Sequence, residues 1–332
     1  MAASQVGSTA GGTGVMSETL LQLESIEIKS VSQNQAIVCG AGLQVNAGEI
    51  TALVGESGSG KTMTALASIG LLPPAVSLLD GSIQIKGEEC AGLSSSQWRK
   101  IRGKQIAMIF QEPMTALDPV CSIGELFDEV LSLDGISRRS RRQHAQSLLE
   151  EVRVPRPGRC LRCVPHELSG GMRQRVVIAL ALARAPSILL ADEPTTALDA
   201  VTTQAIMQLF EDLCRSRGLG ILLVTHDLGL VIQRASLLVV LHSGHVCESG
   251  NAEQILGSPR HPYTRGLLGC RLPLDRRLEP LGDLEALMGE EGIWEPQSTA
   301  EGLLSPWRPV EGMQDDVSHR LVQVGQDHFL AV

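Results

Sequence analysis

The sequence is poor in aromatic residues, has no basic excess and contains no long apolar run. Aromatic side chains make up 2% of its 332 residues while apolar residues make up 43%, so any core must be mainly aliphatic. The net charge of −9 argues against nucleic acid as the main partner, because phosphate binding usually requires a basic surface. A membrane-spanning helix needs about eighteen or more consecutive apolar residues, and none are present. If the protein acts at a membrane, it must dock on another protein there.

Regular cysteine spacing and a secretory signal are also missing. The eight cysteines are scattered, which is typical of a reducing cytoplasm rather than of a disulfide framework. Residues 1–18 are rich in small residues and lack the basic start and apolar segment of a signal peptide. We interpret them as a disordered leader, with Met16 as an alternative start.

Short aliphatic runs alternate with helical patterns along the chain. This strand–helix–strand order predicts an α/β fold. A helical pattern extends from about residue 94 to 162. After about Ile255 Pro, Gly and acidic residues dominate, and no confident structure is expected beyond about Leu274. Strands are expected near 20–28, 36–45, 50–54, 82–85, 187–191 and 220–225, and helices near 62–70 and 202–217.

A glycine-rich loop follows the strand expected at 50–54. Its sequence, GESGSGKT, fits the P-loop pattern G-x-x-x-x-G-K-[ST] in full. Glycines let backbone amides turn toward phosphate oxygens, and the following helix directs its positive end to the same charge. Lys61 is placed to reach the β- and γ-phosphates, and Thr62 to ligate Mg²⁺. A chance match in a turn is the alternative, but the flanking strand and helix favour a nucleotide site formed by Gly55, Glu56, Ser57, Gly58, Ser59, Gly60, Lys61 and Thr62.

An acidic motif, ILLADEPTTALD, occupies residues 188–199. Asp192 ends an apolar strand, where it is placed to hold Mg²⁺ through water. Glu193 is placed to orient and polarise the water that attacks the γ-phosphate. The alternative is that these carboxylates only cap the turn before Pro194, but the P-loop favours catalysis.

The segment LSGGMRQR at 168–175 resembles the signature motif of ABC ATPases. Further family markers follow in the expected order: Gln111 in FQEPMTALDP, Ala197–Leu198–Asp199 after the acidic motif, and His226 in LLVTHD. The resemblance covers Leu20 to about Leu268. It implies a P-loop NTPase fold with a RecA-like core and a helical subdomain at about 96–168, within an ABC ATPase domain at 19–255 and followed by an extension at 256–332.

The resemblance also implies a site shared between two subunits that bind head to tail. Ser169, Gly170 and Gly171 would complete the partner's ATP site, where a hydroxyl, backbone amides and a helix N-terminus bind anions. His226 would contact the γ-phosphate. Gln111 would sense that phosphate and Mg²⁺, in a loop coupled to membrane subunits. Mg²⁺ would thus be held by Thr62, Gln111 and Asp192.

Three segments narrow the resemblance to ATPase subunits of oligopeptide, dipeptide and nickel importers: PHELSGGMRQR, FQEPMTALDP and SPRHPYTRGLL. His–Pro–Tyr at 261–263 marks this group best. After Cys270 no cysteine remains, so the iron–sulfur cluster of many relatives is not expected here, although the final residues VGQDHFLAV still resemble the family's ending. Many ABC ATPases stack adenine on an aromatic residue upstream of the P-loop, but no aromatic residue precedes Trp98 here, which predicts weak base selectivity. Nickel-importing members of the family also tend to lack this aromatic residue, so the resemblance slightly favours nickel or metal complexes as cargo.

Other patterns have simpler interpretations. Cys160-x-x-Cys163 near His166 has no second pair to make a zinc site, so two incidental thiols, or less plausibly a redox pair, are expected. The arginines at 138–142 suit a solvated helix face better than a nucleic-acid or lipid site. His242 and His245, near Cys247, flank a turn expected between two strands and are interpreted as structural rather than metal-binding.

The resemblance implies an ATP-hydrolysing importer subunit on the cytoplasmic face of the inner membrane. Its partners would be two permeases, a second ABC ATPase that is the same or a different chain, and an extracytoplasmic substrate-binding protein. Two alternatives are a soluble ABC ATPase of translation or DNA repair and an exporter ATPase. The single cassette without a long coiled coil argues against the first, and the HPYTRGLL segment argues against the second.

Overall fold

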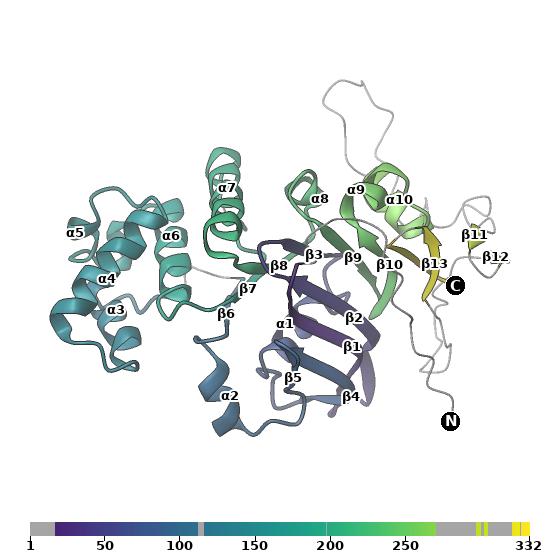
Figure 1. The fold of residues 1–332 in the computed structure, drawn as a ribbon, viewed down its shortest axis with the longest axis horizontal. Helices are drawn as coiled ribbons and strands as arrows, with labels where there is room; N and C mark the ends of the chain where they lie inside the picture. Colours follow the sequence, from purple (N-terminus) through teal and green to yellow (C-terminus); the bar gives the residue numbers. More distant parts are fainter. Residues whose placement is uncertain are drawn as a thin grey trace.

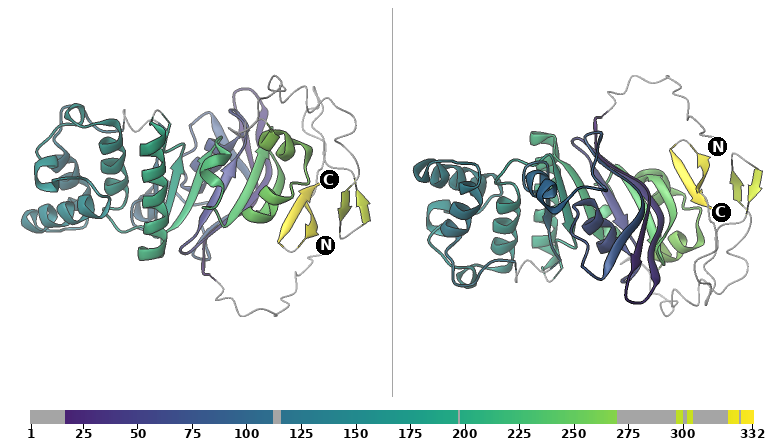
Figure 2. Two further views of the ribbon diagram at one scale, coloured as in Figure 1. Left: turned by 90° about the horizontal axis from the view of Figure 1, so that it is seen from above. Right: turned by 90° about the horizontal axis from the view of Figure 1, so that it is seen from below.

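The computed structural model describes residues 17–111, 116–196, 198–269, 297–299, 302–304, 321–325 and 327–332. Two β-sheets lie in the middle of an elongated molecule (Figures 1 and 2). A group of helices that includes α3 and α4 forms one end, and the C-terminal strands lie toward the other (Figures 1 and 2). This arrangement places the predicted α/β core between two appended parts.

The larger sheet carries the predicted core strands. In the described part of the chain it has eight strands, in the order β13-β14-β10-β9-β3-β8-β7-β6. The strands from β9 to β6 are parallel. Every residue of β3, β7 and β8 is buried, as expected for parallel strands that are covered on both faces. The bounds are β3 Ile50–Val54, β6 Ile106–Ile109, β7 Ile188–Asp192, β8 Gly220–Thr225, β9 Leu237–His242, β10 His245–Asn251, β13 Leu321–Gly325 and β14 His328–Ala331.

The smaller sheet is antiparallel and packs against the larger one. Its order is β2-β1-β4-β5, with β1 Thr19–Ser30, β2 Gln35–Asn46, β4 Val76–Ile85 and β5 Glu88–Glu89. An aliphatic cluster that includes Leu21, Ile85, Leu53 and Val224 joins the two sheets. Helix α1, Lys61–Ser68, contributes Ala65 to the same cluster. The prediction of a mainly aliphatic core is therefore confirmed.

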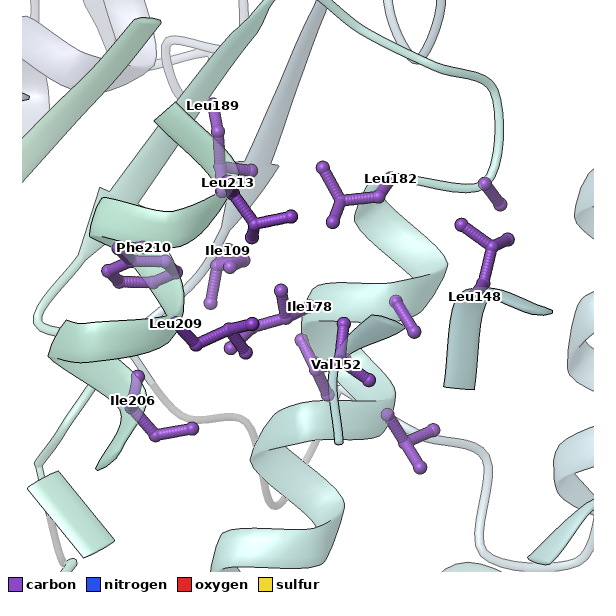
Figure 3. Packing of buried hydrophobic residues seen from close by; sticks show 14 of the residues in the cluster. Ile109, Leu148, Val152, Ile178, Leu182, Leu189, Ile206, Leu209, Phe210 and Leu213 are labelled. Carbon is purple, nitrogen blue, oxygen red and sulfur yellow. The ribbon is translucent and has the colours of Figure 1, made fainter. Parts of the chain in front are cut away.

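A second cluster joins the large sheet to the helices. Figure 3 shows Ile178 of α6 between Phe210 of α7 and Val152. The helices are α2 Ser95–Ile101, α3 Ile123–Ser132, α4 Arg138–Glu151, α5 Pro157–Cys160, α6 Gly170–Ala181 and α7 Ala200–Arg217, with a 3-10 turn at Pro165–Glu167. The helical pattern expected from 94 to 162 was wrong at residues 106–109, which form the parallel strand β6. The helical part of this region resumes only at α3.

The chain after β8 covers and extends the large sheet. Helices α8 Leu228–Val231, α9 Ala252–Gly257 and α10 Pro262–Gly269 pack on β3, β9 and β10 around a buried cluster. The expectation that confident structure ends near Leu274 was wrong, because β14 pairs with β10 and β13 pairs with β14. Strands β11 Gln297–Thr299 and β12 Gly302–Leu304 form a separate pair. Cys270 and residues 1–16 of the predicted leader 1–18 lie outside the described residues.

The other predicted strands and helices are confirmed within a few residues at their ends, except that the strand expected at 82–85 begins six residues earlier, as β4 Val76–Ile85. The turn between β9 and β10 contains Ser243 and Gly244, both with positive φ, and separates His242 from His245 as expected. Among the described residues, no helix has the length and apolar character needed to cross a lipid bilayer.

Candidate nucleotide site

The P-loop lies at the carboxyl end of β3 and runs into α1. Its backbone is in close contact with neighbouring strands, so glycine is required at two positions. A Cβ on Gly55 would lie 2.0 Å from the carbonyl oxygen of Leu241. Gly60 has φ 103° and a Cβ there would lie 2.9 Å from the carbonyl oxygen of Ile37. The loop is thus fixed between β9 and β2, and the spacing of its glycines reflects this packing.

The loop contains polar groups that an anion could satisfy. The Ser59 hydroxyl is buried and has no hydrogen-bond partner in the described part of the chain. Such a group is expected where a ligand supplies the missing partner. The Nζ atom of the buried Lys61 donates to the Glu56 carbonyl oxygen at 2.6 Å. Burial lowers the pKa of Lys61, and the nearby charges of Glu193 and Asp192 oppose that shift. These residues fit a phosphate group.

Thr62 lies at the start of α1 and Asp192 at the end of β7, and the fold brings these distant parts of the sequence together. The Thr62 hydroxyl donates to Asp192 Oδ1 at 3.3 Å. Burial raises the pKa of Asp192, while the Thr62 hydrogen bond acts in the opposite direction. A hydroxyl beside a carboxylate is an oxygen donor set of the kind that Mg²⁺ prefers, so these two residues fit the cation.

Glu193 is the point where the polar groups of the site converge. Its Oε1 lies 2.9 Å from His226 Nδ1, and its Oε2 accepts from Gln111 Nε2 and Thr196 Oγ1, each at 3.1 Å. Burial alone would raise the pKa of Glu193, but the hydrogen bonds from His226 and Thr196 and the charge of Lys61 hold it below its ordinary value. Glu193 is therefore ionised at neutral pH. It does not simply cap the turn before Pro194.

Sheet topology explains why these residues meet. Strands β3, β8, β7 and β6 are parallel neighbours, so their carboxyl ends lie at one edge of the sheet. The P-loop follows β3, His226 follows β8, Glu193 follows β7 and Gln111 follows β6 after one intervening residue. Ligands of α/β sheets bind outside this edge. Glu193 also has φ 45°, in the left-handed region that is unfavourable for a side chain of its size.

The signature residues lie elsewhere on the chain. Ser169 caps α6, where its side chain accepts a hydrogen bond from the Met172 backbone amide. A Cβ on Gly171 would meet Thr202 of α7 at 2.6 Å. Helix α6 belongs to the helical part of the molecule, whereas α1 packs between the two sheets (Figure 1). The site residues therefore form one cluster around the P-loop and a second at the start of α6. Ala197, beside Leu198, lies outside the described residues.

Two contacts of the site were missed by sequence reasoning. Thr196 lies within the acidic motif, so its bond to Glu193 could have been suspected from their three-residue spacing. Tyr263 lies 207 residues from Glu56, and its hydroxyl accepts a hydrogen bond from the Glu56 backbone amide at 3.0 Å. Tyr263 belongs to the His–Pro–Tyr family marker, and no local signal in the sequence indicates this contact.

Comparison with known proteins agrees with this geometry. The family model described as "ABC transporter" matches residues 39–196. The dipeptide transport ATP-binding protein DppD of Bacillus subtilis is 41% identical over 262 residues, covering 78% of each chain. The oligopeptide transport ATP-binding protein OppD of Lactococcus lactis subsp. cremoris is 34% identical and covers 95% of this chain and 94% of its own.

The similarity of the fold to a solved structure supports the same family. The dimeric structure of MJ0796, a bacterial ABC transporter cassette, superposes with a TM-score of 0.61 at 28% identity and covers 70% of this chain and 99% of its own. A post-hydrolysis state of that cassette, bound to ADP and Pi, matches with the same TM-score and identity. The chain belongs to the ABC transporter family, among its ATP-binding and ATP-hydrolysing subunits.

Proposed function

We propose that ATP binds at the P-loop edge of the sheet and that Glu193 directs its hydrolysis. The convergence of His226, Gln111 and Thr196 on Glu193 is the observation that carries this proposal. Residues 55–62 would surround the phosphates, with Lys61 paired to the β- and γ-phosphates. Thr62, Asp192 and Gln111 would hold Mg²⁺, which neutralises phosphate charge when bound.

The chemistry assigned to Glu193 requires an ionised and oriented carboxylate. Water forms a bond to the γ-phosphorus while the bond to the bridging oxygen of ADP breaks. Glu193 accepts a hydrogen bond from that water, turns its lone pair toward phosphorus and takes the proton that the water loses as the new bond forms. His226 holds the carboxylate and adds a donor near the γ-phosphate. Gln111 would sense whether the γ-phosphate is bound, because its amide donates a hydrogen bond to the same carboxylate.

A second subunit completes the site in this proposal. Ser169, Gly170 and Gly171 start helix α6, which lies in the helical part of the molecule, whereas the P-loop follows β3 of the large sheet (Figure 1). This placement supports a role at the site of a partner. The dimeric form of the MJ0796 cassette is a further support. We divide the chain into a leader at 1–18, a cassette at 19–255 with its helical subdomain at about 96–168, and an extension at 256–332.

Peptides are the cargo that we propose. The similar proteins DppD and OppD carry the names of dipeptide and oligopeptide transport proteins. The chain would act with two permeases and a second ATPase at the cytoplasmic face of the inner membrane, and an extracytoplasmic binding protein would select the cargo. Nickel and metal complexes, which the missing aromatic residue slightly favoured, have no support beyond that sequence feature.

The test of this function is the set of proteins that bind the ATP-trapped subunit. Tagged Glu193→Gln is expressed in its native host, membranes are solubilised with ATP, and co-purifying proteins are identified by mass spectrometry. We expect two polytopic permeases and a second ATPase, since trapped ATP holds the dimer closed. Tagged Lys61→Ala, which should not retain ATP, is the matched control. Recovery of ribosomal or DNA-repair proteins instead would overturn the transport function.

Base selectivity is expected to be weak. No aromatic residue precedes Trp98 in the sequence to stack on adenine. The missing contact is worth about 1–3 kcal/mol by analogy with base stacking on aromatic side chains. ATP and GTP should therefore bind with similar dissociation constants, measured by calorimetric titration of the purified chain. A hundredfold preference for ATP would contradict this expectation.

A further inference from the structure

We propose that Tyr263 is a positioning residue for the P-loop. Its hydroxyl accepts a hydrogen bond from the backbone amide of Glu56, the second residue of that loop. The inference rests on the phosphate-binding role proposed for residues 55–62. Tyr263 acts through the loop backbone and contacts no part of the nucleotide in this proposal.

The Glu56 residue is held through both polar groups of its backbone. Its amide donates to Tyr263 at 3.0 Å, and its carbonyl oxygen accepts from Lys61 Nζ at 2.6 Å and from the Ser59 amide at 3.2 Å. Tyr263 therefore fixes the residue whose carbonyl oxygen sets the position of the P-loop lysine. Glu56 is otherwise exposed, so few other contacts restrain this part of the loop.

Tyr263 is itself rigidly held. The side chain is fully buried, and its ring lies 4.1 Å from the ring of His242, centroid to centroid. Its own amide donates to Nδ1 of the buried His261 at 3.1 Å. Burial raises the pKa of the Tyr263 phenol, so the hydroxyl stays protonated at neutral pH. A fixed hydroxyl can orient a loop, whereas a mobile one cannot.

The C-terminal strand β14 is connected to the segment that holds Tyr263, and Glu248 of β10 makes this connection. The carboxylate of Glu248 is fully buried and accepts hydrogen bonds from the backbone amides of Arg260 and His261, at 2.8 and 3.1 Å. Its Oε1 also lies 2.6 Å from Nε2 of His328 in β14. One buried carboxylate thus joins the last strand to the turn that presents Tyr263. The extension thereby contributes to the geometry of the P-loop.

The test compares Tyr263→Phe with Thr264→Val in the full-length chain. Phe keeps the buried ring but leaves the Glu56 amide without its acceptor. Thr264 is the buried neighbour of Tyr263 in α10, and the Thr264 hydroxyl has no hydrogen-bond partner among the described residues. Valine therefore removes a hydroxyl without removing a hydrogen bond. We expect Tyr263→Phe to raise the KM for ATP about tenfold, the change that a free-energy difference of about 1.4 kcal/mol produces. kcat and Tm should stay near wild type, and Thr264→Val should leave KM unchanged.

Several outcomes would overturn the inference. An unchanged KM in Tyr263→Phe would remove the positioning role, as would a fall in kcat and Tm with KM constant. An equal rise in KM in Thr264→Val would assign the effect to packing of α10. Lys61→Ala distinguishes failure of the P-loop role from failure of this inference. If Lys61→Ala binds ATP normally, the proposed P-loop role fails; if it loses ATP binding while Tyr263→Phe keeps the wild-type KM, only this inference fails.

The sequence offers a direct spectroscopic readout as well. Tyr263 is the only tyrosine in the chain, so fluorotyrosine labelling gives a single ¹⁹F resonance from this position. When ATP draws Lys61 away from the Glu56 carbonyl oxygen, the resonance should shift, and in Lys61→Ala it should not. A wild-type resonance that stays in place at saturating ATP would contradict the coupling.

Discussion

Glu193→Gln is expected to lower ATP hydrolysis at least about a hundredfold, the typical contribution of a positioned acid–base group. Glutamine keeps the shape of the side chain, and its oxygen can still accept from Gln111 or Thr196. It loses the negative charge that hydrogen bonds from His226 and Thr196 maintain in Glu193. The chain should therefore bind ATP and fail to turn it over. Steady-state phosphate release and equilibrium ATP binding, measured on the same preparation, test both parts.

The matched control is Glu88→Gln, the same chemical change at an exposed residue of β5. Its turnover should equal that of the wild type. Near-normal hydrolysis by Glu193→Gln would remove Glu193 from its role. Loss of ATP binding together with hydrolysis would show that the carboxylate supports the loop rather than the reaction.

Lys61→Ala is expected to weaken ATP binding about a hundredfold or more, because charge-assisted hydrogen bonds to phosphate are among the strongest polar contacts. Lys61 is buried beside Asp192 and Glu193, and its charge offsets theirs. Without it, only the Mg²⁺ proposed at Thr62, Asp192 and Gln111 would offset the repulsion between the two carboxylates and the incoming phosphates. Calorimetric titration with ATP gives the dissociation constant directly.

Lys104→Ala serves as the comparison for the loss of a lysine charge. Lys104 is largely exposed and forms a surface ion pair with Asp134. Such pairs contribute little, so this variant should bind ATP like the wild type. If Lys61→Ala also bound ATP normally, the P-loop would not be the phosphate site.

Contiguous motifs indicated from the sequence which residues belong to the candidate site. Residues 55–62 and 188–199 each place polar side chains at or directly after the end of a short buried strand, so the local pattern was enough to expect them at the carboxyl ends of strands. The side-chain contacts on Glu193 follow from the order of the parallel strands. Sequence alone does not supply that order, which depends on crossover connections through the whole core.

The errors have a common physical origin. Strand β6 has four residues inside a region of helical pattern, and only pairing with β7 stabilises it as a strand. Strand β14 also has four residues, and β10, far away in the sequence, provides its hydrogen-bond partners. The bond between Tyr263 and Glu56 has the same character. In each case tertiary contact overrides local propensity.

At Glu193, an unfavourable left-handed backbone conformation coincides with the carboxylate that we assign to ATP hydrolysis. A glutamate at φ 45° carries a steric cost of about 1–2 kcal/mol that a glycine would not. Replacing Glu193 with Gly would relieve that cost and remove the carboxylate in the same step. The same change also removes the hydrogen bonds that Glu193 forms with His226, Gln111 and Thr196, so its net effect on stability is the difference between the relieved strain and those lost bonds. Thermostability screens of this chain should therefore be coupled to an assay of ATP hydrolysis.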